Sequence, residues 1–248
     1  MDDMQIVERE KVVEGSPIII TGLPDVGLVG AIASIHLIKK LSMKEYGHVE
    51  YDLIPPVIIL HEGEIKAPVR LYSKGKIVTL ISEITLPTET LMKLSKKIAE
   101  YAKEKESRHV IMLSGLVTPN RLDIEKPKVY GIATRREDRE MLEKNGITLL
   151  KEGYVTGINA LILRECMKKN ISAIILLAES FNEFPDPAAA AANLEALSKI
   201  TGIKVDVKEL IVKAEEIRLK ARELMRRTQQ QLKALKKVPE TEIPLMYR

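Results

Sequence analysis

Short runs of apolar, mostly β-branched residues recur along the chain, and stretches with helical spacing separate most of them. Apolar runs of this length are typical of strands that are covered on both faces. The expected strands are residues 17–21, 56–60, 76–82, 109–114, 129–134 and 173–178. The expected helices are residues 25–41, 88–105, 136–144, 157–169 and 188–200. This alternation predicts an α/β fold with a mostly parallel sheet flanked by helices.

Two of the expected helices have recognisable start signals. Thr88 is expected to cap its helix, because a threonine side chain accepts a hydrogen bond from a free amide of the first turn. In the sequence PDP, Asp186 is expected to cap a helix whose first residue is Pro187. These signals favour helices over strands in both stretches.

The pattern changes after Gly202. Residues 207–237 contain neither glycine nor proline, and their apolar positions repeat with 4,3,4,3 spacing at Leu210, Ala214, Ile217, Ala221 and Leu224. This heptad spacing predicts a long amphipathic helix that pairs with another helix or projects from the body. Eight basic residues and one acidic residue lie in residues 218–237, so the second half of this helix is strongly positive.

The last eleven residues are expected to form a flexible tail, because Pro239 and Pro244 oppose helix formation. The two prolines also stiffen the tail locally. The sequence therefore predicts three parts. Residues 1–206 form the α/β core domain, residues 207–237 form the long basic amphipathic helix, and residues 238–248 form the tail.

Composition narrows the possible functions. Aromatic residues make up 4% of the chain and tryptophan is absent, which disfavours base stacking as a main activity. The net charge of +4 comes from 39 basic and 35 acidic residues, too even a balance to indicate a nucleic acid or a membrane as partner. No apolar run reaches the length that a bilayer requires.

A cytoplasmic location is expected from the cysteine content and the amino terminus. Cys166 is the only cysteine and lies in an apolar-periodic stretch, so it cannot form an internal disulfide and is expected to be a small buried side chain. The amino terminus is acidic where a signal peptide is basic.

A glycine-containing turn, TGLPDVGLVG at residues 21–30, follows the first expected strand. Gly22 and Gly27 have the spacing of a phosphate-binding loop, but Leu28 and Val29 stand where that loop needs a lysine and a hydroxyl group. The carboxylate of Asp25 would also repel a pyrophosphate. No nucleotide cofactor is therefore expected. Small residues at positions 27, 30, 31 and 34 instead predict a helix that closely approaches the sheet or a neighbouring subunit.

Catalytic candidates lie after the expected strands, but they form no familiar constellation. They are Asp25, Glu83, Ser114, Arg135, Glu179, Ser180 and Glu183. Glu179 and Glu183 could share a helical face, and Ser114 with Gly115 could form a nucleophile turn, yet no GxSxG motif surrounds Ser114. His36, His48, His61 and His109 lack metal-ligand spacing. We therefore expect no enzyme and no metal, with a phosphorylase- or hydrolase-like enzyme as the alternative.

The basic stretch at residues 218–237 has a second interpretation. Its charges could bind phosphate backbones. It lacks interleaved aromatic residues and has a regular apolar seam, so a solvated face of an assembling helix is the favoured interpretation. It could also bind an acidic protein surface.

The carboxyl-terminal residues Met246, Tyr247 and Arg248 place an apolar side chain and an aromatic ring at a chain end, where polar residues are usual. A free terminus can insert into a pocket of a partner, where a lysine captures its carboxylate and the ring fills an apolar slot. Several weak tails in one oligomer would add avidity. The sequence therefore predicts that this end is buried in another protein.

Four segments together resemble the archaeal proteasome assembly chaperone homologues of the PAC2 family. They are TGLPDVGLVGAIASIHLI, VTGINALILRECMKKNISAIILLAE, PDPAAAAANLEALSKITGIKVDVKEL and the terminal MYR. The resemblance extends over approximately residues 13–216 and the tail. It implies an α/β domain similar to purine nucleoside phosphorylases and related hydrolases, without known catalysis.

The resemblance also implies a role for the carboxyl terminus. The last three residues look like the hydrophobic-Tyr-X motif that docks in pockets between α subunits of the proteasome core particle. Met246 matches the hydrophobic position, Tyr247 the tyrosine that shifts the gate-forming segment, and Arg248 supplies the terminal carboxylate for a pocket lysine. Similar proteins form homo-oligomers and act without ATP. We therefore expect an assembly chaperone or activator that self-associates, with residues 207–237 as the expected contact.

Overall fold

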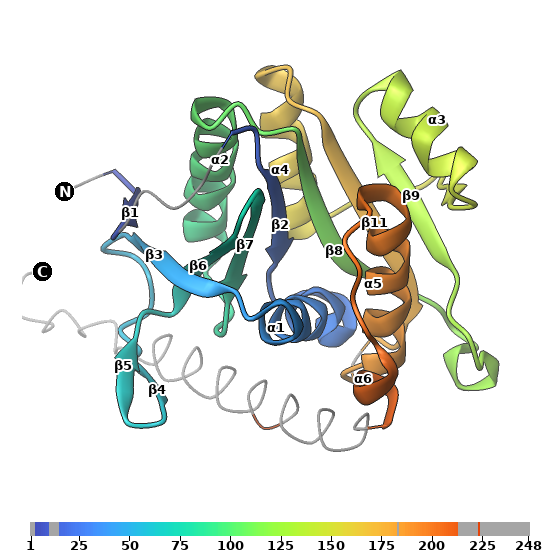
Figure 1. Cartoon of the computed structure of the whole chain (residues 1–248), viewed down its shortest axis with the longest axis horizontal. Helices are drawn as coiled ribbons and strands as arrows, with labels where there is room; N and C mark the ends of the chain where they lie inside the picture. Colours follow the sequence, from blue (N-terminus) through green and yellow to red (C-terminus); the bar gives the residue numbers. More distant parts are fainter. Residues whose placement is uncertain (1–2, 10–14, 183, 213–222, 224–248) are drawn as a thin grey trace, which may run out of the picture.

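The structure is a computed structural model of the full chain, and it describes residues 3–9, 15–182, 184–212 and 223. Its centre is a nine-stranded sheet with the order β1-β3-β6-β7-β2-β8-β11-β9-β10 (Figure 1). These strands are β1 Gln5–Glu8, β2 Ile18–Gly22, β3 Lys44–Glu50, β6 Val69–Lys74, β7 Ile77–Ser82, β8 His109–Val117, β9 Val129–Ala133, β10 Thr148–Leu149 and β11 Ala173–Ser180.

The α/β class is confirmed, but the sheet is mixed where a mostly parallel one was expected. Strands β7, β2, β8 and β11 are parallel to one another. On one side β6, β3 and β1 pair antiparallel, and on the other side β9 pairs antiparallel with β11. Short connections explain part of the difference. The turn at Gly75 joins β6 to β7 with a positive φ of 55°, and a turn this short permits only antiparallel pairing.

Five of the six expected strands lie in this sheet, as β2, β7, β8, β9 and β11. The expectation for residues 56–60 was wrong, because only Ile59 and Leu60 belong to a strand, β4 (Ile59–His61). Strand β4 pairs with β5 (Glu64–Lys66) in a separate two-stranded hairpin. Sequence analysis missed β3, in which buried and exposed residues are mixed, and β6, in which the polar residues Arg70 and Ser73 hold buried positions. Neither strand has a continuous apolar run.

All five expected helices are present. They are α1 Val29–Leu41, α2 Thr88–Glu104, α3 Arg136–Lys144, α4 Gly157–Lys168 and α5 Pro187–Thr201. The first begins later than expected, because a 3-10 turn, Val26–Leu28, precedes it. The expected cap at Thr88 was wrong, since Pro87 holds the cap position and no side-chain cap forms there. The cap at Asp186 is confirmed, with the Ala189 amide donating to its carboxylate at 3.0 Å.

Helices α2 and α4 cover one face of the sheet, and α1 and α5 cover the other (Figure 1). Successive strand residues point to opposite faces, so each central strand contributes to both cores. On β2, Ile19 packs toward α2 and α4 while Ile20 packs toward α1 and α5. Strands β2 and β11 are buried along their whole length, which explains their continuous apolar sequences.

A short helix, α6 (Lys208–Val212), follows α5 and packs on the α1–α5 layer. Leu210, the first position of the heptad pattern, is buried there. Lys40 pairs with Glu209, and Nε2 of His36 lies 2.8 Å from the carbonyl oxygen of Asp206. Apart from Glu223, the rest of the expected helix at 207–237 and the tail at 238–248 lie outside the described residues, so the three-part organisation stays a prediction.

Gly30 tests how closely α1 packs on the sheet. A Cβ atom at this position would lie 2.2 Å from the carbonyl oxygen of Leu113 on β8. We expect Gly30→Ala to lower the free energy of unfolding by about 2–3 kcal/mol, because neither backbone can move without disturbing its element. Urea unfolding followed by circular dichroism measures the change. Ile35→Ala, on the half-exposed side of α1, is the control and should cost about 1 kcal/mol or less. Equal losses would show that the close approach is unimportant.

Candidate functional site

The sequence-predicted binding residues Met246, Tyr247 and Arg248 lie outside the described residues. The structure does describe most of the residues considered for the alternative, which is a catalytic site at the carboxyl ends of the strands. Ligands of open α/β sheets bind at that end, so each candidate there is considered in turn.

The turn between β2 and α1 is folded tightly onto the strand ends. Gly27 has a φ of 58°, and a Cβ atom there would lie 2.1 Å from Oγ of Ser180. Leu28 is buried and also left-handed, with a φ of 49°. The amide of Asp186 donates to the carbonyl oxygen of Gly27 at 2.9 Å. The small residues of this turn therefore let it pack against β8 and β11, as one of the two sequence interpretations expected.

Asp25 is the centre of a polar network beneath this turn. Its Oδ2 accepts hydrogen bonds from Oγ of Ser114 and Nδ2 of Asn159, both at 2.7 Å. Asn193 on α5 donates to the carbonyl oxygen of Ser114 at 2.8 Å. One carboxylate thus links the β2–α1 turn, β8 and α4. Sequence analysis selected Asp25 and Ser114 but missed Asn159, which lies in the buried face of an otherwise ordinary helix.

The structure rules out the possible nucleophile turn at Ser114 and Gly115, which the missing GxSxG motif had already disfavoured. Ser114 lies within β8, three residues before its end, and its side chain is buried. Its hydroxyl group donates to a carboxylate, with no histidine among the hydrogen-bond partners of the network. A nucleophilic serine needs an exposed Oγ and a base that an orienting group holds. This network is therefore suited to fixing three elements, not to acyl transfer.

Glu83, at the end of β7, belongs to a second and separate cluster. The fully buried Arg70 pairs with Glu83, donates from Nε to the hydroxyl of Tyr72 at 2.9 Å, and donates from Nη1 to the carbonyl oxygen of Ala67 at 2.6 Å. Nε2 of His61 lies 2.9 Å from the carboxylate of Glu83. A buried guanidinium is costly unless it is paired, so Glu83 is needed to hold Arg70 and the base of the hairpin.

The remaining candidates do not come together. Glu179 lies on β11, so the possibility that it shares a helical face with Glu183 is excluded. Glu183 lies outside the described residues. The carboxylate of Glu179 accepts from the amide of Lys128 at 2.9 Å. Arg135 follows β9, which runs antiparallel to β11. It therefore lies near the amino end of β11, where it donates to the carbonyl oxygen of Asn170.

A buried ion pair that sequence analysis missed fixes the start of α5. Nε of Arg121 donates to Asp186 at 2.7 Å, and Nη2 donates to its other oxygen at 3.1 Å. The guanidinium also lies over the ring of Phe181, 5.2 Å from its centre. The PDP sequence predicted a capping role for Asp186 but gave no sign of its partner, which comes from a loop 65 residues earlier.

The surroundings of His109 and Cys166 indicate structural roles for both residues. Nδ1 of His109 lies 2.7 Å from Oγ of Ser172, which donates to Asp138, and burial lowers the pKa of this histidine against the opposing effect of Asp138. Cys166 is fully buried, as expected, and burial raises its pKa to about 12. In the described part of the chain, no group of three or more His, Cys, Asp or Glu side chains could hold a metal ion.

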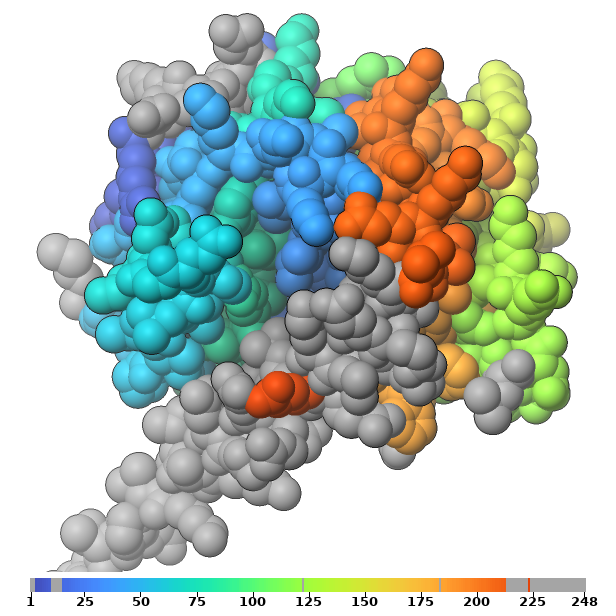
Figure 2. All heavy atoms as spheres, turned by 60° about the horizontal axis from the view of Figure 1, so that its bottom comes forward, coloured from blue at the N-terminus to red at the C-terminus, as the bar shows by residue number. Residues whose placement is uncertain are grey.

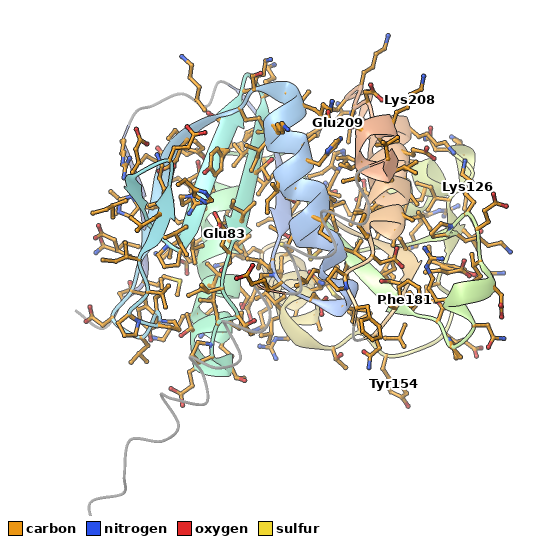
Figure 3. The ribbon with its side chains drawn as sticks, turned by 90° about the horizontal axis from the view of Figure 1, so that it is seen from below. Glu83, Lys126, Tyr154, Phe181, Lys208 and Glu209 are labelled. Atoms are coloured by element: carbon orange, nitrogen blue, oxygen red, sulfur yellow. The ribbon has the colours of Figure 1, made fainter. Side chains whose placement is uncertain are left out.

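The described surface also carries exposed apolar side chains. Ile58, Leu60 and Ile65 lie on and beside the β4–β5 hairpin, and Tyr154 is almost fully exposed. Figure 3 shows Tyr154 and Phe181 at one end of the α1–α5 layer and Lys208 and Glu209 at the opposite end. Within residues 3–9, 15–182 and 184–212, no helix is long and apolar enough to cross a bilayer.

The Arg121–Asp186 pair provides a test of this arrangement. We expect Asp186→Ala to lower the free energy of unfolding by about 3–5 kcal/mol, because it leaves the guanidinium buried without its partner and removes a helix cap. The double variant Arg121→Leu/Asp186→Ala should be more stable than Asp186→Ala alone. The exposed pair of Lys126 and Glu195 is the control, and Lys126→Ala should cost about 1 kcal/mol or less. Additive losses in the double variant would contradict this account.

The surroundings of Cys166 predict low thiol reactivity. Thiol reagents attack the thiolate, and with a pKa of about 12 very little thiolate is present at pH 8. Reaction with a chromogenic disulfide at pH 8 should be at least about a hundredfold slower in the folded protein than in guanidinium chloride. Rapid labelling of the folded protein would show that this part of the core opens readily.

Comparisons with known proteins agree on one family. The PAC2 family matches the chain over residues 19–225. An uncharacterized protein of Methanocaldococcus jannaschii is 33% identical over 237 residues, which is 96% of each chain.

Two solved structures extend this comparison. Pyrococcus furiosus PbaA, an archaeal homolog of proteasome-assembly chaperone, is 34% identical with a TM-score of 0.84, covering 94% of this chain and 99% of that chain. Pyrococcus furiosus PbaB, an archaeal proteasome activator, is 22% identical with a TM-score of 0.77, covering 95% of this chain and all of that one. At this lower identity the likeness to PbaB shows the fold alone.

Proposed function

The chain belongs to the PAC2 family, and we propose that it is a non-enzymatic proteasome assembly chaperone or ATP-independent activator. In this proposal its carboxyl-terminal tail docks in pockets between the α subunits of the proteasome core particle. The similarity to PbaA, together with the fold shared with PbaB, supports a role at the proteasome.

One observation carries the docking mechanism, the terminal sequence Met246, Tyr247 and Arg248 on a tether that contains two prolines. Hydrophobic and aromatic side chains at a free chain end gain free energy when a partner buries them, and a terminal carboxylate is a single charge that a pocket lysine can neutralise. Fully extended, eleven tail residues reach at most about 40 Å from their root. The side chain of Arg248 has no assigned role.

The geometry of the strand ends supports a non-enzymatic protein. Ser114 is held by Asp25, and Glu83 is held by Arg70, so the two strongest catalytic candidates each serve a structural partner. A working nucleophile or general base needs geometry in which a substrate atom can replace that partner. Binding, not turnover, is therefore the proposed activity.

Self-association and location belong to the same proposal. A homo-oligomer would present several tails at once, and each additional tail raises the effective concentration of the others near the ring of pockets. Residues 207–237 stay the proposed contact between copies, through side chains that do not face their own α/β body. The proposed location is the cytoplasm, and the origin archaeal, because the relatives named above come from archaea.

Removing the last three residues tests the docking mechanism. We expect a chain that ends at Leu245 to lose at least about tenfold in affinity for a purified archaeal core particle, because the ring of Tyr247 and the correctly placed carboxylate are both lost. Any stimulation of peptide hydrolysis should disappear with it. Surface plasmon resonance and a fluorogenic peptide assay measure the two effects.

Arg248→Ala is the matched control, because it keeps the chain length, the carboxylate and Tyr247. It should bind the core particle within about twofold of the unchanged protein. Full binding by the truncated chain would overturn the tail mechanism, whereas turnover of nucleosides or simple esters would favour the enzymatic alternative.

A further inference from the structure

The β4–β5 hairpin presents an apolar face that the described part of the chain leaves exposed. Leu60 and Ile65 are a cross-strand pair, so their side chains share one face, and Ile58 extends it by one alternation. Ile58, Leu60 and Ile65, here named the hairpin face, are 66%, 67% and 70% exposed. The opposite side of the hairpin contacts the body through Ile59 and His61. Three clustered aliphatic side chains mark an interaction surface.

The surroundings of the hairpin face are acidic. Residues 50–66 contain Glu50, Asp52, Glu62 and Glu64 against a single lysine, Lys66. The four acidic residues are exposed. A partner with an apolar stripe and basic flanks would match both the shape of the surface and its charge.

The described chain reaches α6 on the same face of the molecule but at its other end. Figure 2 shows α1 between the hairpin and α6. The described part of this helix ends at Val212, and both Ile211 and Val212 are exposed. Lys39, Lys204 and Lys208 are exposed there against one exposed acidic residue, Asp206, so this end of the face has a net positive charge. Between the two ends, Ile35 of α1 is half-exposed.

We propose that residues 213–237 of the same chain cover the hairpin face. Apart from the exposed Glu223, these residues lie outside the described part, so the argument for what they bind comes from their sequence. Their apolar seam at Ala214, Ile217, Ala221 and Leu224 continues from the buried Leu210. After Lys213, two acidic residues, Glu215 and Glu216, precede the basic stretch at 218–237. This order of charge is complementary to a surface that is basic at α6 and acidic at the hairpin.

The segment is long enough for this path. Helix α5 packs on β11, and the hairpin precedes β6, so the two lie four strand spacings apart, about 19 Å. Crossing the sheet from its amino edge to its carboxyl edge adds about 20 Å, the length of six strand residues. The diagonal of about 28 Å requires about 19 helical residues at 1.5 Å each. Residues 213–237 provide this length, and their last turns, which carry the apolar residues Leu232 and Leu235, would lie at the hairpin.

This docking would set the root of the tail at the carboxyl edge of the sheet, beside the hairpin. It concerns the segment before the tail and holds whether or not Met246, Tyr247 and Arg248 bind a proteasome. Deletion of those three residues leaves the proposed contact unchanged, so the two proposals fail in different experiments.

Carbodiimide cross-linking of the full chain tests the contact, because this reagent joins carboxylates and lysines only where they touch. We expect a product of single-chain size in which Glu62 or Glu64 is joined to Lys233, Lys236 or Lys237, identified by mass spectrometry of its peptides. The absence of this product would overturn the proposal. The same link found only in a product of two-chain size would assign the hairpin face to a second copy and would also overturn it.

Two serine variants show whether the apolar side chains hold the segment. Leu60→Ser/Ile65→Ser should lower the yield of the cross-link at least about tenfold, because the acidic residues remain but the apolar contact is lost. Met167→Ser is the matched control, since Met167 is 62% exposed on α4 in the opposite helix layer. It should leave the yield unchanged. An equal yield in the hairpin variant and the control would overturn the proposal.

Discussion

The close contact between the β2–α1 turn and the ends of β8 and β11 determines where the rest of the α1–α5 layer lies. Gly30 lies against the carbonyl oxygen of Leu113, and Gly27 lies against Ser180, with no room for a side chain at either position. Helix α1 is thereby fixed on the sheet. Its far end holds Asp206 and Glu209 through His36 and Lys40, so the position of α6 depends on this contact.

The carboxyl edge of the sheet is where α/β enzymes have their active sites, but here the polar groups at this edge are bound to other parts of the protein. In α/β enzymes this edge leaves groups available for a substrate. Here Asp25 binds Ser114 and Asn159, while Asp186 binds Arg121 and the first turn of α5. Each carboxylate joins elements that are far apart in sequence. The polar residues at this edge therefore hold the fold together.

Sequence analysis predicted the buried elements well, for a physical reason. Strands β2 and β11 are covered on both faces, so their sequences are continuously apolar, and the PDP start of α5 follows from proline and capping chemistry alone. Strands β3 and β6 have partly exposed residues and gave no such pattern. The antiparallel direction of the outer strands was missed for a different reason. Strand direction depends on the connections between strands, and the apolar pattern contains no information about them.

The candidate site shows the same limit at the level of single side chains. Asp25 and Ser114 were selectable because they follow or lie in recognisable strands, but their contact depends on a hydrogen bond between residues 89 positions apart. Arg70 and Arg121 are buried only because Glu83 and Asp186 lie beside them, and no local pattern identifies a buried arginine. In this protein the local sequence therefore shows where a polar residue lies along an element, whereas its partner depends on the topology of the sheet. A chain end, in contrast, can be interpreted without the topology, which is why the terminal residues carried the functional hypothesis.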